Sequence, residues 1–149
     1  MIRFFGGRVM TLANGIETQD IEVWTEGSKI VFVGKPKAEE LDGKVFEREY
    51  DLKGNLLMPS FKNAHTHSAM TFLRSYADDM PLQDWLFKQI FPMEAKLDGE
   101  KVYWLTKLAI LEYLTTGCTA AFDMYFELDD YVKACIESGF RSVLCGAAV

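Results

Sequence analysis

The spacing of apolar residues changes near residue 60 and divides the chain into two parts. Before this point, apolar residues come in short runs that alternate with polar residues or stop at glycine, which is typical of strands. Such runs occupy residues 2–5, 9–11, 16–25, 29–34 and 45–52. Asn14-Gly15 has the residue types that accept the positive φ of a hairpin turn. Residues 37–44 are polar and predict a loop. We therefore expect a small all-β unit.

After residue 60, apolar residues recur three and four positions apart, as on one face of an amphipathic helix. This spacing predicts helices over residues 81–90, 102–114 and 128–138. Continuous apolar runs predict strands over residues 56–63, 118–124 and 141–148. Strands that alternate with helices in this way are typical of a parallel sheet, so the fold class that we expect is α/β.

Several polar and glycine residues mark where these helices begin and end. Asp98 stands where an N-cap is expected, and Gly139 stands where a helix would stop. Asp78 and Asp79 are expected to cap the helix that opens at Pro81.

Composition and charge exclude several classes of partner. The 149 residues are 49% hydrophobic and carry a net charge of −6, without a run of basic residues, so we expect neither nucleic acid nor a membrane as partner. No apolar stretch approaches the roughly 20 residues of a membrane span, and the first residues are interrupted too soon for a signal peptide, which favours a cytoplasmic location. Cys118, Cys135 and Cys145 lie in apolar runs and are expected to be free and buried.

The last predicted strand ends with the chain, and this ending suggests that more chain follows. A (β/α)₈ barrel takes roughly 250 residues, and residues 56–149 supply strands and helices for about two and a half of its eight units. We expect this sequence to be the front part of a longer one. An open three-stranded sheet beside a small β unit is the alternative for a chain that folds alone.

The two histidines of the chain, His65 and His67, are separated by one residue. Residues two apart in a strand point to the same face, so both imidazoles can converge on one metal ion at about 2.0–2.1 Å. The end of a parallel strand is also where α/β barrels build their active sites. The alternative is a pair of hydrogen-bonded histidines without a metal, because so short a motif is weak by itself. A catalytic zinc needs a third protein ligand, which we expect from elsewhere.

Residues 58–67, Met-Pro-Ser-Phe-Lys-Asn-Ala-His-Thr-His, resemble the first metal-binding strand of the amidohydrolase superfamily. The usual form of that strand is Pro-Gly-Phe, two or three residues, and then His-x-His. Ser60 replaces the glycine and would be strained if its position needed a positive φ. Within the superfamily, the chain is similar to the 5-methylthioadenosine/S-adenosylhomocysteine deaminases and the related chlorohydrolases. The segments that carry this narrower resemblance are residues 27–34, 69–86, 90–97 and 116–125.

The resemblance implies a β-sandwich, built from both ends of a long chain, beside a metal-dependent (β/α)₈ TIM barrel. Residues 1–57 would belong to the sandwich, and residues 58–149 would form the first units of the barrel. It also implies that His65 and His67 are two ligands of a single Zn²⁺ or Fe²⁺. The other ligands, two histidines and an aspartate, and the proton-shuttling glutamate lie on later strands in the family. No catalytic residue is therefore assigned within this chain.

The resemblance implies two substrate-binding residues as well. Glu94 matches the carboxylate that binds the ribose hydroxyls of a nucleoside, and Trp85 matches an aromatic wall of the substrate pocket. Without the resemblance, Glu94 would be interpreted as a solvated residue and Trp85 as a core residue. For Asp123, capping the following turn and lining the barrel mouth both stay open.

Two classes of function follow. The first is a metal-dependent hydrolase of C–N bonds that deaminates an adenosine-type nucleoside, such as S-adenosylhomocysteine or 5-methylthioadenosine, through metal-activated water. It would act only with the rest of the barrel. Assembly into a homo-oligomer is kept as an open alternative. A chlorohydrolase or a guanine- or cytosine-type deaminase is the alternative among enzymes. The second class is a non-catalytic truncated fragment whose open sheet edge pairs with another copy or partner.

Overall fold

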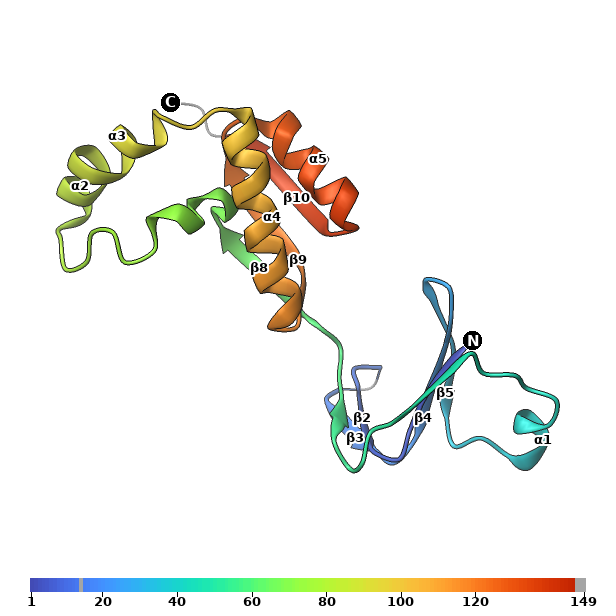
Figure 1. Ribbon diagram of the computed structural model, residues 1–149. Helices are drawn as coiled ribbons and strands as arrows, with labels where there is room; N and C mark the ends of the chain where they lie inside the picture. The colour runs from blue at the N-terminus through green and yellow to red at the C-terminus, as the bar shows by residue number, and fades with distance from the viewer. Residues whose placement is uncertain (14, 147–149) are drawn as a thin grey trace. The chain divides into compact units, whose positions relative to one another are not determined.

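A computed structural model describes residues 1–13 and 15–146 of the chain (Figure 1). The chain forms two compact units, Met1–Pro59 and Ser60–Val149. Among the described helices, none combines the length and the apolar composition that crossing a bilayer requires. The cytoplasmic location expected from the sequence stays a prediction.

The first unit is built from short strands in two sheets, of order β5-β4-β1-β6 and β3-β2-β7. The strands are β1 (Ile2–Phe5), β2 (Arg8–Thr11), β3 (Glu17–Gln19), β4 (Glu22–Glu26), β5 (Lys29–Gly34), β6 (Arg48–Asp51) and β7 (Leu56–Leu57). The strands predicted over residues 2–5, 9–11 and 29–34 are thereby confirmed. β2 and β3 are antiparallel, with Thr11 opposite Glu17, while Asn14 of the predicted turn lies outside the described residues.

The polar loop predicted over residues 37–44 is wrong in part, because it contains a short helix, α1 (Ala38–Leu41). The helix starts where the Glu40 carboxylate accepts a hydrogen bond of 2.7 Å from the backbone N–H of Lys37. A local side-chain hydrogen bond of this kind satisfies a backbone donor at the start of a helix. The pattern of polar and apolar residues does not predict such a bond.

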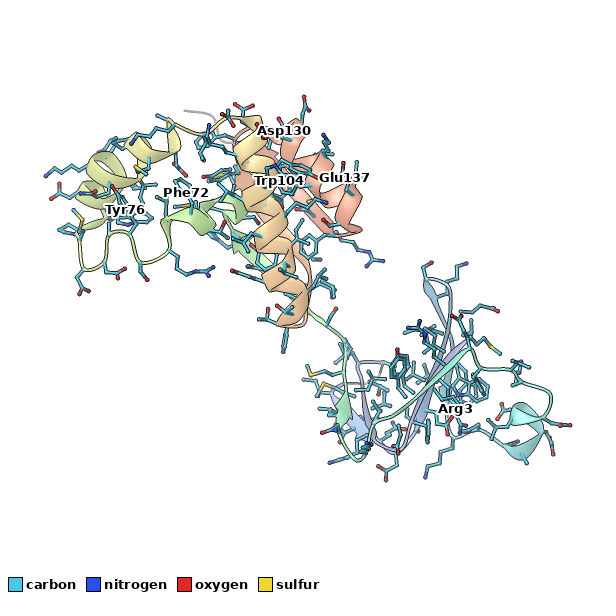
Figure 2. All side chains as sticks on the ribbon, in the orientation of Figure 1. Arg3, Phe72, Tyr76, Trp104, Asp130 and Glu137 are labelled. Atoms are coloured by element: carbon cyan, nitrogen blue, oxygen red, sulfur yellow. The ribbon has the colours of Figure 1, made fainter. Side chains whose placement is uncertain are left out.

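Arg3 joins three strands of the larger sheet and is labelled in Figure 2. Its guanidinium pairs with Glu22 on β4 at 2.6 Å and with Glu49 on β6 at 2.9 Å. The hydrogen bond from Arg3 holds the pKa of the Glu22 carboxyl below its usual range. Beside this pair, the buried indole of Trp24 stacks on Phe32 with 4.1 Å between ring centroids. Ion pairing and aromatic packing together hold this small sheet.

The second unit is a parallel α/β layer, as predicted. Its sheet has the order β10-β9-β8 and consists of β8 (Phe61–Thr66), β9 (Cys118–Tyr125) and β10 (Arg141–Gly146). The helices α4 (Gly99–Thr115) and α5 (Leu128–Ser138) pack together against it (Figure 1). The helices predicted over residues 102–114 and 128–138 are thus confirmed. Residues 147 and 148 of the last predicted strand lie outside the described residues.

The sheet buries one face and exposes the other. Along β9, Ala121, Asp123 and Tyr125 are buried, whereas Phe122 and Met124 between them are exposed. Because side chains alternate between the two faces of a strand, this pattern places the helices on a single side. The core on that side contains Val102, Ile110, Ala121, Tyr125, Tyr131 and Cys135.

A second helical region lies between β8 and α4. A 3₁₀ turn, η1 (Ser68–Leu73), follows β8 directly. Further on, α2 (Leu82–Asp84), a π-helical stretch η2 (Trp85–Ile90) and α3 (Phe91–Glu94) follow one another without a break. The helix predicted over residues 81–90 is confirmed and extends to Glu94. Pro92 lies inside this continuous segment and has no N–H to donate to the preceding turn, which coincides with the departure from α-helical pairing in η2.

The single strand predicted over residues 56–63 is wrong. Leu56–Leu57 forms β7, which pairs with β2 in the first unit, and β8 begins only at Phe61. Pro59 lies between them and has no N–H to donate to a ladder. The residue after it, Ser60, does not adopt a positive φ, so its replacement of glycine introduces no strain. The Ser60 hydroxyl instead bonds that of Thr119 at 2.5 Å.

Two of the predicted helix boundaries are confirmed and one is wrong. The side chain of Asp98 accepts from the backbone N–H of Lys101 at 2.9 Å and so caps α4. Gly139 ends α5 with φ +64°. The residue at the start of α2 is Pro81 itself, and no side chain caps it, so Asp78 and Asp79 do not have the predicted role.

The three cysteines are free, as predicted, and two of them are buried. Cys118 is buried at the start of β9 and Cys135 is buried in the core, whereas Cys145 is only half-buried. The expectation of burial is therefore wrong for Cys145, because it pairs with Met124 and so lies on the face of the sheet that the helices do not cover.

Gly139 offers a direct test of the left-handed helix end. Gly139→Ala should lower the free energy of unfolding by about 1 kcal/mol, because a Cβ is disfavoured in the left-handed region. Nothing lies within 4 Å of the position that the Cβ would take, so the cost is conformational and not steric. Gly139→Asn should cost less, since asparagine adopts this region more readily. Urea unfolding measures both, and equal losses for the two variants would contradict the interpretation.

Candidate functional site

The two histidines lie where β8 ends. His65 is the fifth residue of the strand, and His67 is the first residue after it. The pairing register with β9 shifts between Asn63 and Thr66, so the strand is irregular at His65. The two imidazole centroids are 5.1 Å apart with an angle of 85° between the ring planes. His65 is exposed and His67 is half-buried. The two rings are therefore close together and perpendicular, with the edge of one toward the face of the other.

One hydrogen bond determines which nitrogen of His67 is free. Nδ1 lies 2.8 Å from the backbone carbonyl oxygen of Met124. A carbonyl oxygen can only accept, so Nδ1 of His67 donates the proton. In the neutral ring, Nε2 then keeps its lone pair, which is the arrangement that metal-binding histidines use.

The residues on both sides of His67 are held from neighbouring elements. Oγ1 of Thr66 and Oγ of Ser68 lie 2.5 Å and 2.9 Å from the same atom, Oη of Tyr113 on α4. The backbone N–H of Ser68 donates to the carboxylate of Asp123 on β9, at 3.1 Å and 3.3 Å to its two oxygens. Asp123 is fully buried. Its carboxylate thus holds the backbone after His67, which is neither of the two roles that the sequence left open.

A pocket of about 330 Å³ opens beside His67. The structure brings three of the four predicted site residues, His67, Trp85 and Glu94, to the wall of this pocket. Trp85 and Glu94 are both half-buried, so neither is a core residue or a fully solvated one. His65 is not part of the wall but contacts His67. The other lining residues are Met70, Leu86, Ile90, Phe91, Met124, Tyr125 and Phe126.

The helical region after β8 places Trp85 and Glu94. Trp85 begins the π-helical stretch, and Glu94 ends α3 directly after it. A π-helical turn is wider than an α-helical one and is frequent at functional sites. Nine positions are about two and a half turns of a regular α-helix and would there lie on opposite faces, so the wider π-helical turns help to bring both residues to the same pocket. The lining is mostly apolar with a few polar groups, as in most small-molecule sites.

The metal-ligand set is incomplete within the described residues. No group of three or more His, Cys, Asp or Glu side chains among residues 1–13 and 15–146 is arranged to hold a metal ion. The two histidines alone would be too few, since a catalytic zinc ion requires at least three protein ligands.

Sequence reasoning missed Tyr125, which lines the pocket from the end of β9. Its side chain is buried, and its hydroxyl has no hydrogen-bond partner among the described residues. Burial raises the pKa of Tyr125 far above its usual range, and the negative charge of the Glu94 carboxylate raises it further. The Glu94 carboxylate is thus close enough to the Tyr125 hydroxyl to act on it electrostatically. Residues 118–124 form a continuous apolar run, so the sequence carried no signal of which side chains face the packed side.

Sequence reasoning also missed Tyr113, and no local signal pointed to it. Tyr113 is 47 residues from Thr66 and 45 from Ser68, and it lies on a helix whose apolar pattern predicts only packing. The contact exists because α4 packs against the 3₁₀ turn that follows β8.

Comparison with known proteins identifies the family. Residues 56–149 match the model of the amidohydrolase family, and the chain belongs to that family. It is 44% identical over 123 residues to a 5-methylthioadenosine/S-adenosylhomocysteine deaminase of Desulfitobacterium hafniense, covering 83% of this chain and 28% of that protein. It is 53% identical over 95 residues to a 5'-deoxyadenosine deaminase of Methanoregula boonei, and this match covers 64% of this chain and 22% of that protein.

A solved structure shares the described fold. The crystal structure of an adenosine deaminase from Xanthomonas campestris with bound zinc matches with a TM-score of 0.87 and 33% identity. The match covers 95% of this chain and 33% of that one. This chain therefore spans well under half the length of the relatives that it matches.

The unpartnered hydroxyl of Tyr125 predicts an unusual response to mutation. Tyr125→Phe should leave the free energy of unfolding unchanged or raise it by about 1 kcal/mol, because it removes a buried polar group that has no partner. Tyr131→Phe is the matched control, since Tyr131 is equally buried but its hydroxyl bonds Ser142 at 2.9 Å. The free energy of unfolding of Tyr131→Phe should fall by about 1 kcal/mol. Urea unfolding without ligand measures both, and equal losses would show that the Tyr125 hydroxyl has a partner.

Proposed function

We propose that this chain is the front part of a metal-dependent deaminase that hydrolyses the C–N bond of an adenosine-type nucleoside, such as S-adenosylhomocysteine or 5-methylthioadenosine. In this proposal, residues 1–57 belong to a β-sandwich and residues 58–149 form the first units of a (β/α)₈ barrel. The observation that carries the proposal is the convergence of His67, Trp85 and Glu94 on one pocket. The names of the three relatives described above, each a deaminase of an adenosine-type nucleoside, support it.

His65 and His67 fit a metal ion. Their ring centroids are 5.1 Å apart. This distance leaves room for one ion bound by a nitrogen of each ring at about 2.0–2.1 Å. The bond from Nδ1 of His67 to Met124 leaves Nε2 as the ligand atom. Imidazole suits both zinc and iron, and the zinc of the solved adenosine deaminase favours zinc. Such an ion would supply Lewis acidity and lower the pKa of a water molecule to about 7.

Glu94 and Trp85 would bind and orient the substrate. A carboxylate accepts two hydrogen bonds at once, which matches the vicinal hydroxyls of a ribose. Trp85 offers a flat apolar surface beside the ring or the 5' substituent of the nucleoside. With the ribose at Glu94, the base is the part of the substrate that reaches toward His67. The apolar side chains around the pocket exclude water and so strengthen these polar contacts.

The metal assignment is testable in the full-length protein. His65→Ala and His67→Ala should each lower the zinc retained after dialysis by about tenfold or more, because each removes a ligand. Elemental analysis by mass spectrometry measures the retained metal. Lys62→Ala is the control on the same strand, since its ammonium bonds Ser60 and Thr119 and not the histidines. Unchanged zinc in both histidine variants would refute the assignment.

The role of Glu94 separates a nucleoside deaminase from an enzyme that acts on a free base. Glu94→Gln should raise the KM for 5-methylthioadenosine by about 10–100-fold, because the ribose loses a charge-assisted hydrogen bond. Steady-state kinetics of ammonia release measures the change. Glu100→Gln, an exposed carboxylate in the first turn of α4, is the matched control and should leave KM unchanged. An unchanged KM in Glu94→Gln would favour the chlorohydrolase or the guanine- or cytosine-type deaminase.

A further inference from the structure

His67 lies in a segment whose shape regular secondary structure does not determine. It follows the last residue of β8 and precedes η1, with φ −133° and ψ 77°. Its carbonyl accepts one bond, from the N–H of Met70 at 2.9 Å. A metal ligand has to be held within about 0.5 Å of its productive position, so other groups must fix this segment.

One hydroxyl on α4 forms hydrogen bonds with the residues before and after His67. Oη of Tyr113 lies 2.5 Å from Oγ1 of Thr66 and 2.9 Å from Oγ of Ser68. Each hydroxyl donates one proton and also accepts, so the three groups form a connected chain of hydrogen bonds. Members of such a chain strengthen one another in a buried site.

The Tyr113 ring is itself held in place. It stacks on Phe140 with 5.5 Å between centroids and 20° between planes. Phe140 is buried in the core between the helices and the sheet. The hydroxyl of Tyr113 is therefore a fixed point, and its position relative to the sheet is set by the packing of α4.

We propose that Tyr113 is a positioning residue for metal binding, which acts by clamping Thr66 and Ser68 on both sides of His67. This inference rests on the proposed function, in which His67 is a metal ligand. The Met124 carbonyl fixes the rotation of the ring, and the Tyr113 hydroxyl holds the side chains of the residues before and after it. Groups that orient a ligand in this way typically contribute about 10–100-fold to metal affinity.

The test is the zinc affinity of the full-length protein, measured by competition with a chelator of known affinity. Tyr113→Phe keeps the ring and removes only the hydroxyl, and it should weaken zinc binding by about tenfold. Tyr103→Phe is the matched control on the same helix. The hydroxyl of Tyr103 donates a hydrogen bond of 2.5 Å to Glu137 on α5. Glu137 and Trp104, the residue after Tyr103, are labelled in Figure 2. This variant should bind zinc as the unaltered protein does.

A second pair of variants tests the same clamp from its other side. Thr66→Ser keeps the hydroxyl and should retain zinc affinity, whereas Thr66→Val keeps the shape, removes the hydroxyl and should lose affinity by about tenfold. If Tyr113→Phe fails to fold, this pair decides. Equal zinc affinity of the serine and valine variants would overturn the proposal.

His67→Ala separates the failure of this inference from the failure of the proposed function. If His67→Ala binds zinc as tightly as the unaltered protein, His67 is not a ligand, and both proposals are overturned. If His67→Ala loses zinc while Tyr113→Phe keeps full affinity, the proposed function stands and the clamp is overturned. Parallel losses in Tyr113→Phe and Thr66→Val, with full affinity in Tyr103→Phe and Thr66→Ser, support the clamp.

Discussion

The candidate site depends on the parallel pairing of β8 with β9, which brings the carboxyl ends of two strands together. Thr66 pairs with Asp123, so the segment that starts at His67 lies beside Met124 and Tyr125. Two contacts follow directly from this register: the bond from His67 to the Met124 carbonyl and the bond from Ser68 to the Asp123 carboxylate. A slip by one residue would turn the other face of β9 toward the histidines and would remove both contacts.

The second constraint is the helical segment between β8 and α4, which closes the pocket from the other side. Its π-helical stretch begins with Trp85, and its last residue is Glu94. Proteins keep strained or unsatisfied groups mainly where function needs them. The pocket contains such a group in the hydroxyl of Tyr125, which is buried next to the charge of Glu94. The unpartnered hydroxyl costs local stability, while the ring of Tyr125 belongs to the buried core cluster of the unit.

The described sheet is also unusual because it is packed on one face only. Phe122, Met124 and Val143 are exposed on the opposite face, although side chains of this kind are normally covered in a parallel sheet. In the proposed barrel, this face would point to the interior. The proposed metal site has the same character, since its two histidines would need further ligands. Membership of the amidohydrolase family explains both features together.

The sequence by itself determined the helices that include residues 102–114 and 128–138, the Asp98 cap, the Gly139 stop and the His65–His67 spacing. Each of these depends on residues within a few positions of one another, where periodicity and backbone preferences decide. Only the tertiary structure decided that Leu56–Leu57 joins the first unit, because its partner β2 is far away in the chain. It alone also placed Tyr113, Asp123 and Tyr125 around the site, since packing between distant segments leaves no trace in local patterns. Glu94 and Trp85 were accessible from the family resemblance but not from the residues, which indicated a solvated carboxylate and a core tryptophan until folding placed both at one pocket.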